Sequence, residues 1–573
     1  MKKLRWPLLI VLLALVAIAV LLASQPNSPI LPVDIIDAPE EVKPVVGGIY
    51  AEGLIGSYHR LNPVLDTYHP ADRDIDRLLY SGLVRFDDHG LPVGDLAESY
   101  GISTDGKVYN FSIRENAVWH DGEPVTSEDI AFTIELLKDE NSLLSDDVRE
   151  LWNQVQVNLL ADNSIQFRLS EPFAPFMDYL TFGVLPEHLL SVSSFTELID
   201  SDFNLNPVGS GPFAFNSLIV EGGEVKGVAL KAFEDYYGQK PNLDQFVFRY
   251  YPDAQSMLDA YRSGEILGLS QVSEEILPGV LSEPNLDVYT GRLPQVTMIF
   301  LNLDNPDVPF LQDASIRRAM LMALNRQWYV DHIVNSQAIV ADGPIFPGTW
   351  AFYDGIEHVN FDRSTAVNLI KEAGYTIPAD GGTVRVNEEG VRLELDLVYP
   401  DEPHYESLAQ AIQKDWEELG MGVNITPVSY EEMVAETLPS RLFHATLTDI
   451  NLANSPDPDP YPFWHQTQKS SGQNYSQWDD FQASEYLERA RIVAKLGDRT
   501  TNYKNFQVRF TQELPSLPLF YPVYTYAVDS RLHGVTLGPL FDRSDRFVAV
   551  TGWGLLEEAP IVQVREIIAT PTP

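Results

Sequence analysis

Residues 393–450 carry the most regular pattern of apolar and polar positions in the chain. The pattern predicts three strands and two helices, in the order 393–399, 405–419, 423–428, 430–438 and 443–450. In the first helix, Leu408, Ile412 and Trp416 recur at the four-residue spacing of one helix face, which is typical of a helix packed on a sheet. Strands that alternate with helices of this length indicate βαβ units on a partly parallel sheet, and hence an α/β fold.

The loop after the last of these strands is a candidate binding loop. In α/β sheets, ligands bind beyond the carboxyl ends of the strands. The strand over 443–450 leads directly into residues 451–454 and then into a proline-rich segment, 456–465, which carries Tyr461 and Trp464. Prolines restrict the backbone there, so little entropy is lost when the aromatic rings are ordered around a ligand. The segment is therefore predicted to form a pocket wall.

Further elements outside this unit complete a mixed pattern. Residues 108–113 alternate as a strand, and Thr126 with Asp129 forms the signature of a capping box at the start of a helix. Asp313 and Asp362 are the predicted N-caps of two more helices.

The N-terminus predicts where the protein resides. Lys2, Lys3 and Arg5 precede an apolar run of 17 residues, 7–23, and a positive segment followed by an apolar one is an export signal. The run reaches the lower limit for spanning a bilayer, and no clear small-x-small cleavage site follows it. We expect residues 1–25 to be an uncleaved signal-anchor rather than a cleaved signal peptide, with the body on the extracytoplasmic face of the membrane.

Two segments at the ends of the body are rich in proline. Residues 26–47 also carry many acids and are predicted to form a stalk linker. Residues 557–573 end in Ala-Thr-Pro-Thr-Pro and are expected to be a loosely ordered tail.

Charge and cysteine content argue against several classes of function. The chain has 39 Lys and Arg against 82 Asp and Glu, a formal net charge of −43 at pH 7. This charge disfavours binding to nucleic acid, whose phosphates require a basic surface, and binding to anionic lipid. The chain has no cysteine, which excludes disulfides, cysteine-based metal clusters, thiol nucleophiles and a lipoprotein anchor.

No catalytic signature stands out. The sequence lacks the dinucleotide, phosphate-loop, zinc-protease and serine-hydrolase motifs. His120 lies in an Asp-Gly turn, which we interpret as structural. Asp457 and Asp459 alternate with prolines, unlike the acids of a curled calcium loop, so neither a metal site nor a cofactor is expected. The many carboxylates leave an extracellular hydrolase as an alternative.

Several short blocks, in a fixed order, resemble the family 5 extracellular solute-binding proteins, the oligopeptide- and dipeptide-binding components of ABC importers. The longest block, residues 109–130, reads YNFSIRENAVWHDGEPVTSEDI. The other blocks are residues 61–63, 80–84, 92–100, 207–213, 236–238, 313–325, 456–458 and 474–476. The resemblance covers the chain from about residue 48 to 550, and the ordered combination makes it specific.

The resemblance implies a two-lobed periplasmic-binding-protein fold with a hinge and an extra subdomain in the first lobe. The first lobe would combine residues 48–87, 207–295 and 515–556, the subdomain would span 88–206, and the second lobe 296–514. Such a protein is a monomer that encloses a small solute between its lobes and delivers it to the permease subunits of an ABC importer. It is not an enzyme.

One position departs from the family pattern. In peptide-binding members, an aspartate before the Asp-Pro pair binds the ligand's N-terminal ammonium, whereas Asn454 occupies that place here. Asparagine brings no charge, and charge-assisted hydrogen bonds are roughly twice as strong as neutral ones. Either Asp457 or Asp449 supplies the charge, or the ligand is an oligosaccharide, a modified peptide or another solute. A peptide is the leading hypothesis, and a binding module that feeds a sensor is a further alternative.

Six side chains are predicted to line the ligand cleft. Five belong to the second lobe and one to the first. They are Asn454, Asp457, Tyr461, Trp464 and Trp350, with Tyr58 opposite them.

Overall fold

The structure is a computed structural model that describes residues 47–556, apart from residues 88, 191, 193, 380 and 453–456. The expected signal-anchor (1–25), nearly all of the expected stalk and the expected tail (557–573) lie outside the described residues, as does Asn454. Within the described part of the chain, every helix is too short or too polar to cross a membrane.

The α/β unit predicted from the sequence is confirmed. It consists of β15 (Glu394–Pro400), α11 (Pro403–Glu417), β16 (Gly422–Val428) and β17 (Ala445–Asn451). β15 pairs in parallel with both β16 and β17. The segment predicted as one helix over 430–438 contains a π-helical stretch, Met433–Thr437. Pro439 has no N–H to continue the regular α-helical hydrogen bonds, which accounts for the widened turn.

The other predicted elements are also present. β5 spans Val108–Ile113, as expected, and Thr126 and Asp129 form a capping box at the start of α3 (Ser127–Lys138). Asp313 caps α8 (Ala314–Ala323), and Asp362 caps α10 (Arg363–Glu372). Further helices are α2 (Pro70–Leu79), α4 (Asp146–Gln154), α6 (Ala254–Arg262), α9 (Arg326–His332), α15 (Phe481–Ile492) and α16 (Leu496–Glu513).

A 12-stranded sheet is the main layer of the described chain. Its strand order is β16-β15-β17-β13-β18-β11-β1-β10-β9-β8, with β12 and β14 also paired to β18. The strands not yet given are β1 (Ile49–Ile55), β8 (Phe213–Glu221), β9 (Glu224–Ala232), β10 (Gln245–Tyr251), β11 (Gly268–Leu269), β12 (Leu286–Arg292), β13 (Gln295–Leu301), β14 (Ala338–Val340) and β18 (Ser516–Asp529).

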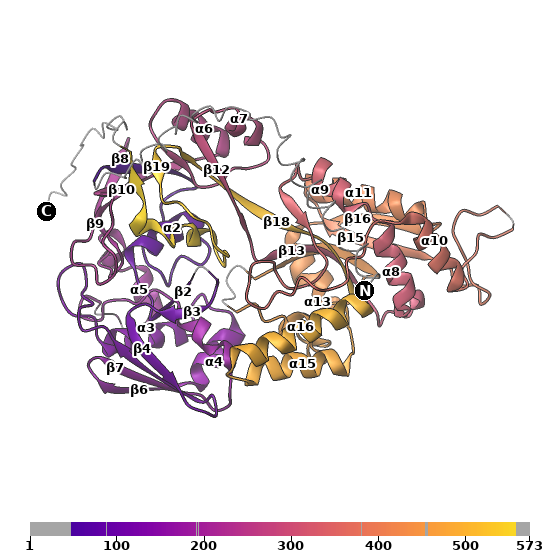
Figure 1. Cartoon of the computed structure of the whole chain (residues 1–573), viewed down its shortest axis with the longest axis horizontal. Coiled ribbons are helices and arrows are strands. Elements are labelled where there is room, and N and C mark those ends of the chain that lie inside the picture. Colours follow the sequence, from indigo (N-terminus) through magenta and orange to yellow (C-terminus); the bar gives the residue numbers. More distant parts are fainter. Residues whose placement is uncertain are drawn as a thin grey trace, which may run out of the picture. The chain divides into compact units, whose positions relative to one another are not determined.

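The long strand β18 joins the two halves of this sheet (Figure 1). Residues 516–520 of β18 pair with β13, whereas residues 523–529 pair with β12. β12 and β13 follow each other in sequence, so the chain crosses between the halves at residues 293–294, close to where β18 changes partner. Two crossings that lie side by side, each only a few residues long, are the geometry of a hinge.

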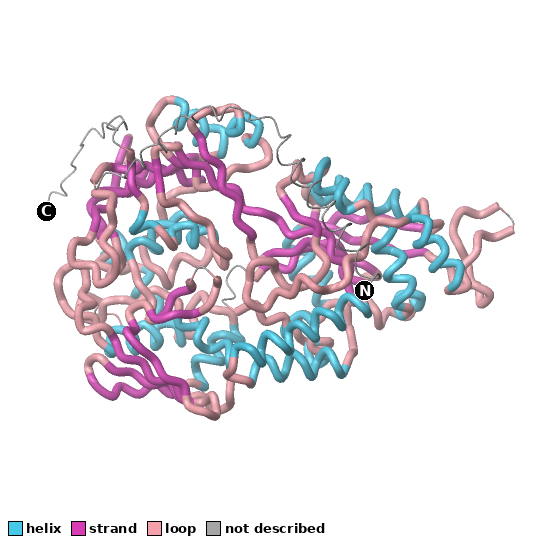
Figure 2. The backbone as a smooth tube through the Cα atoms, viewed as in Figure 1, coloured by secondary structure: helices cyan, strands magenta, loops and turns pink. Residues whose placement is uncertain are grey.

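Four further strands form a separate antiparallel sheet, drawn in magenta at the lower left of Figure 2, and they precede β8 in sequence. It has the order β4-β5-β7-β6, with β4 over Ala97–Ile102, β6 over Gln156–Ala161 and β7 over Ser164–Arg168. Trp119, Trp152 and Phe167 are buried in its own apolar cluster, which includes residues of α3.

The large sheet is covered on both faces at β13. Ile299 and Leu301 belong to one buried cluster, with α8, α11 and β15, whereas Met298 and Phe300 belong to another, with α15 and α16. This alternation follows from the two-residue period of a strand. Another cluster packs around β1 and β10 and includes Trp553.

A buried ion cluster fixes the C-terminal segment to β1 and α2. Arg546 is fully buried, and its guanidinium lies 2.7 Å from a carboxylate oxygen of Glu52 and 2.7 Å from one of Asp74. The hydroxyl group of Tyr526 also donates to Glu52, at 2.6 Å. Segments that are hundreds of residues apart in sequence therefore meet around one cation.

Candidate functional site

A cavity of about 1160 Å³ lies among segments that the sequence separates widely. Its wall is formed by α2 and the loop before it, by β2 (Val84–Phe86) and β3 (Pro92–Gly94), and by α4. The 3₁₀ helices η1 (Ala174–Leu180) and η6 (Arg543–Phe547) complete it. Its volume slightly exceeds the range of roughly 300–1000 Å³ that is usual for small-ligand pockets.

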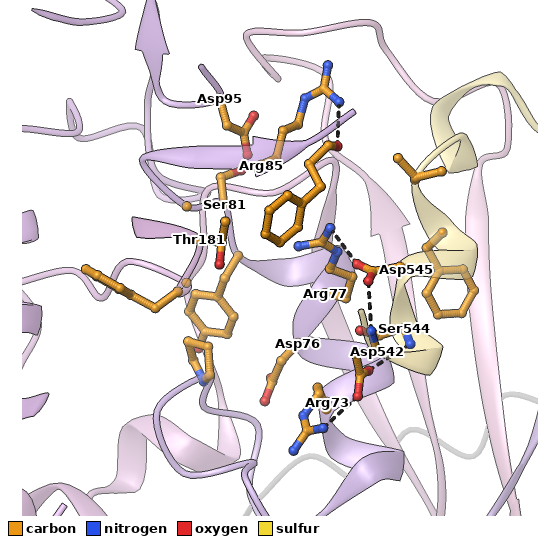
Figure 3. Close-up of a pocket in the computed structure, with 18 of the residues that line it drawn as sticks. Arg73, Asp76, Arg77, Ser81, Arg85, Asp95, Thr181, Asp542, Ser544 and Asp545 are labelled. Carbon is orange, nitrogen blue, oxygen red and sulfur yellow. Dashed lines mark hydrogen bonds and ion pairs between the residues drawn. The ribbon is translucent and has the colours of Figure 1, made fainter. Parts of the chain in front are cut away.

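Two arginines on one face of α2 hold η6 against the cavity (Figure 3). Arg73 and Arg77 are four residues apart and therefore point the same way. Arg73 pairs with Asp542 at 2.7 Å, and Arg77 pairs with Asp545 at 3.0 Å. Burial raises the pKa of Asp542, but Arg73 and the Ser544 backbone outweigh this effect, so the pKa of Asp542 lies below its ordinary value.

The opposite part of the wall comes from β2, β3 and the turn after β9. Asp95 accepts a hydrogen bond of 2.6 Å from the hydroxyl group of Tyr237. Arg114 donates to the backbone carbonyl of Asp95 at 2.7 Å, and its guanidinium lies 5.6 Å from the centre of the Tyr237 ring. Arg85 contributes a further cation to the lining, so arginines and aspartates share this cavity.

Two carboxyl groups in the lining are buried without full hydrogen bonding. Neither side-chain oxygen of Asp76 has a hydrogen-bond partner among the described residues, and Oδ1 of Asp178 also has none. Burial raises the pKa of each group well above its ordinary value, and neighbouring aspartates raise it further. Such groups hold a proton until a cation compensates the charge.

Of the residues predicted to bind ligand, Asp457 and Trp350 meet around Arg499. Nη2 of Arg499 lies 3.0 and 2.8 Å from the two carboxylate oxygens of Asp457, which is only 2% exposed. The same guanidinium lies 4.7 Å from the centre of the Trp350 ring. Asp178 and Tyr179, which line the cavity, are close enough to Asp457 for its charge to raise their pKa values.

Tyr461 belongs to a second group of stacked side chains. Its ring stacks on His465, at a centroid distance of 4.1 Å, and the guanidinium of Arg491 lies 3.7 Å from its centre. Arg491 also pairs with Asp459 at 2.5 Å. Both acids of the Asp-Pro-Asp-Pro segment are therefore bound to arginines.

The remaining predicted residues are placed apart from these two groups. Trp464 is 1% exposed and packs in the core between Phe300 and Phe510. Tyr58 is half-buried, and its hydroxyl group donates to the Asn204 carbonyl at 2.9 Å. None of the five described residues is part of the cavity lining given above, and Asn454 lies outside the described residues. Their role in ligand binding stays a prediction.

Asp449, the other acid that could replace the missing charge, keeps one oxygen available. Oδ2 accepts a hydrogen bond from the side-chain amide of Gln295. Oδ1 is buried and has no hydrogen-bond partner among the described residues. Asp449 also contributes, after burial, to raising the pKa of Tyr405.

One group of side chains in the described chain is compact enough to hold a metal ion. The ligand atoms of His59, His69 and Asp72 lie within 4.8 Å of one another. Asp72 is already engaged, because its carboxylate accepts the backbone N–H groups of His59 and Arg60. The two imidazole rings stack at 3.9 Å. The sequence predicts no metal site, and the group lies next to Tyr58.

The acids and arginines of α2 were not singled out from the sequence. The sequence does carry a sign of these buried acids, because positions 72, 75, 76 and 79 follow the spacing of one buried helix face. Two of these positions are aspartates, Asp72 and Asp76, beside Ile75 and Leu79, and all four are buried. Charged residues within an apolar stripe indicate a buried polar site.

Comparisons with known proteins give the same family as the sequence blocks. Residues 92–473 match the model of the bacterial extracellular solute-binding proteins, family 5 Middle. The oligopeptide-binding protein AppA of Bacillus subtilis is 25% identical over 509 residues, which cover 87% of this chain and 91% of that protein. The dipeptide-binding protein of Escherichia coli is 24% identical over 524 residues, covering 87% and 94%.

A solved structure supports the fold. AppA of Bacillus subtilis in complex with a nonapeptide superposes with a TM-score of 0.64 at 24% identity, over 90% of this chain and all of that one. The family match and this structure confirm the expected α/β class and two-lobed fold, and members of the family bind solutes rather than catalyse reactions. The chain belongs to the family 5 extracellular solute-binding proteins.

Proposed function

We propose that the protein captures a peptide and delivers it to the permease subunits of an ABC importer. Relatives that match along most of the chain are named as oligopeptide- and dipeptide-binding proteins, which supports a peptide as the solute. The cavity of about 1160 Å³ has room for several residues of a peptide. An oligosaccharide or another solute is the alternative.

The observation that carries this proposal is that one cavity is lined both by arginines and by buried acids that can ionise when a cation binds. A free peptide has an ammonium group at one end and a carboxylate at the other, and each is bound best by a charged partner. Arg85 and Arg114 lie in the lining together with Asp76 and Asp178. The hydroxyl groups of a neutral sugar can also hydrogen-bond to these side chains, but only a zwitterionic ligand has ends that pair with both kinds as ions.

We assign roles to the predicted site residues according to how exposed their side chains are. Trp350 and Tyr461 are half-buried, so part of each ring is available to a ligand. We assign ligand contacts to them and to Asn454 and Tyr58. Asp457 and Trp464 are almost fully buried, and we assign them the task of holding the loop and Arg499 in place.

Capture requires the two lobes to close on each other. We assign residues 48–87, 207–295 and 515–556 to the first lobe, 88–206 to its subdomain and 296–514 to the second lobe. The separate apolar clusters support this division, and so do the crossings at 293–294 and near 522. A single chain suffices for this mechanism, so we expect a monomer.

The proposed location is the extracytoplasmic face of the membrane, with residues 1–25 as an uncleaved anchor and no further lipid contact. The basic residues before the apolar run support this assignment. Peptide mapping of the mature protein tests it. Recovery of the N-terminal residues supports an anchor, whereas a mature N-terminus near residues 24–28 shows that the segment is cleaved and the protein released.

A thermal-shift measurement on the purified protein tests the ligand class. Pools of short peptides and of oligosaccharides are added separately. A ligand at 100 times its dissociation constant adds about 2.7 kcal/mol to the free energy of unfolding, which raises the melting temperature. A shift with peptides alone supports the proposal, whereas a shift with oligosaccharides alone rejects the peptide and keeps the solute-binding role.

A further inference from the structure

Asp76 is a buried acid with nothing in the described chain to bind it. It lies on α2, is 1% exposed, and belongs to the cavity lining. Both carboxyl oxygens lack a hydrogen-bond partner among the described residues. Its carboxyl group points away from the pair formed by Arg77 and Asp545 (Figure 3). A buried carboxyl group without a hydrogen-bond partner destabilises the folded protein. A group of the ligand that hydrogen-bonds to it would therefore bind favourably.

The nearest arginines are already bound to other acids. Arg73, three residues earlier on the helix, pairs with Asp542 and contacts Asp66 at 3.4 Å. Arg77 pairs with Asp545 at 3.0 Å. These pairs hold the C-terminal segment against α2, so neither arginine can turn to Asp76 without releasing η6.

The surroundings of Asp76 are rich in negative groups. Asp66 and Asp72 lie close enough to raise its pKa, and burial raises it most. The backbone N–H of Asn62 lowers this pKa to a smaller extent, without reaching hydrogen-bond geometry. Arg73 also lowers this pKa, but in the described part of the chain Arg73 and Arg77 are paired with other acids, so the site attracts a further positive charge.

We propose that Asp76 forms a subsite in this cavity for a positively charged group of the ligand, either an ammonium or a guanidinium. This inference rests on the proposed capture of a peptide in the same cavity. It explains how an amine can be bound although Asn454 has no charge and Asp457 is held by Arg499. The charge is supplied by α2, which is far from Asn454 in sequence.

Binding at this subsite releases a proton. The neutral carboxyl group of Asp76 transfers its proton to the solvent and becomes the carboxylate that pairs with the incoming cation. The titratable and charged groups that face Asp76 are Asp66, Asp72, Arg73, Tyr58, Tyr80 and Tyr250. The tyrosines keep their protons at neutral pH because burial raises their pKa values.

The test compares three proteins, each as the full chain. Asp76→Asn keeps the size of the side chain but cannot carry a charge. Asp529→Asn is the control, because Asp529 is likewise buried and accepts a hydrogen bond from a tyrosine, Tyr261, but it lies outside the cavity lining. Each protein is titrated calorimetrically, in two buffers with different ionisation enthalpies, against a pool of tripeptides and against the same pool with acetylated N-termini.

If the subsite exists, the wild type prefers the free-amine pool, and Asp76→Asn weakens binding of that pool by about 10- to 100-fold, the range expected for one charge-assisted contact. The number of protons released also falls in this variant. Asp529→Asn keeps both the preference and the proton release. Unchanged melting temperature of Asp76→Asn, or an increase, shows that the effect is not a failure to fold.

Other outcomes separate the two hypotheses. If Asp76→Asn binds both pools as tightly as the wild type does, peptide capture stands and the subsite is rejected. If the wild type binds neither pool, the proposed function fails. Spermidine and arginine methyl ester are then tested alone. A melting-temperature increase that disappears in Asp76→Asn retains the cation subsite without a peptide, and no increase rejects it.

Discussion

Nη2 of Arg499 donates to both carboxylate oxygens of Asp457, and the two side chains are among the most buried ionic groups in the described chain. Arg499 also lies against the Trp350 ring. Asp457 therefore positions an arginine and a tryptophan, and it could bind an ammonium group only by giving up this pair. If the proposed ligand is a peptide with a free amine, another acid would have to supply the charge that Asn454 lacks.

Asp457→Asn should destabilise the protein strongly. Removal of one partner leaves Arg499 buried and uncompensated, which typically costs about 3–5 kcal/mol. Urea unfolding followed by fluorescence measures the change. Glu485→Gln is the matched control, because it breaks an exposed pair with Arg489 that contributes at most about 0.5 kcal/mol. A loss below about 1 kcal/mol in Asp457→Asn would mean that Arg499 is compensated in another way, by water or by ionisation of the neighbouring Asp178.

Asn454→Ala should weaken ligand binding and leave stability unchanged, in contrast to Asp457→Asn. If Asn454 contacts the ligand, its removal weakens binding by about 5- to 10-fold, as expected for one neutral hydrogen bond. The free energy of unfolding without ligand should stay within about 0.5 kcal/mol of the wild type. Calorimetry with a peptide that binds the wild type measures the affinity. Unchanged affinity removes Asn454 from the site.

The α/β unit could be predicted because burial leaves a local record in the sequence. Val108–Ile113 and the strands β15, β16 and β17 were found from their apolar spacing within a few residues of their true ends. Caps such as Asp313 and Asp362 are equally local. The ordered family blocks then gave the two-lobed fold, which no single pattern reveals.

The cavity could not be predicted in the same way. Arg73 and Asp542 are 469 residues apart in sequence, and nothing near either residue specifies the other. The aspartates of α2 were visible within an apolar stripe, but the sequence does not say whether a buried acid is paired. Trp464 illustrates the same limit, because the sequence does not say whether an aromatic ring in a loop belongs to the core or to a ligand site, and this ring is buried in the core.

Arg546→Met should also destabilise the protein, and the loss of stability should depend on pH. The substitution leaves Glu52 and Asp74 buried without their cation, a loss of about 3–5 kcal/mol near neutral pH. Burial already raises the pKa of both acids, and without Arg546 these pKa values rise further. The folded variant then binds more protons than the unfolded chain, so its stability falls as the pH rises above about 4.

Urea unfolding of Arg546→Met at pH 5 and pH 7.5 checks this dependence. The difference in stability from the wild type should be larger at the higher pH. Arg262→Met, which breaks exposed pairs with Asp259 and Glu283, is the control and should cost less than about 1 kcal/mol at both values. An equal loss for Arg546→Met at both values would indicate that solvent compensates the two acids.

His120 should make the protein less stable in acid. The backbone N–H of Gly209 donates to Nδ1 of His120 at 3.1 Å, so the ring carries its proton on Nε2 and donates to the Gly211 carbonyl, also at 3.1 Å. Burial lowers the pKa of this imidazole to about 4. The unfolded chain binds a proton near pH 6.5 and the folded protein does not, so the stabilisation is present above pH 6.5 and is lost as the pH falls toward 4.

The comparison with His120→Gln isolates this effect from the titration of the many carboxylates. Glutamine does not titrate, so the advantage of the wild type should shrink by about 2 kcal/mol between pH 7 and pH 4.5. Urea midpoints at both values measure it. His404→Gln, at an exposed position early in α11, should follow the wild type at both values. Parallel profiles for the wild type and His120→Gln would show that His120 is protonated in the folded state and that the turn opens to accommodate the charge.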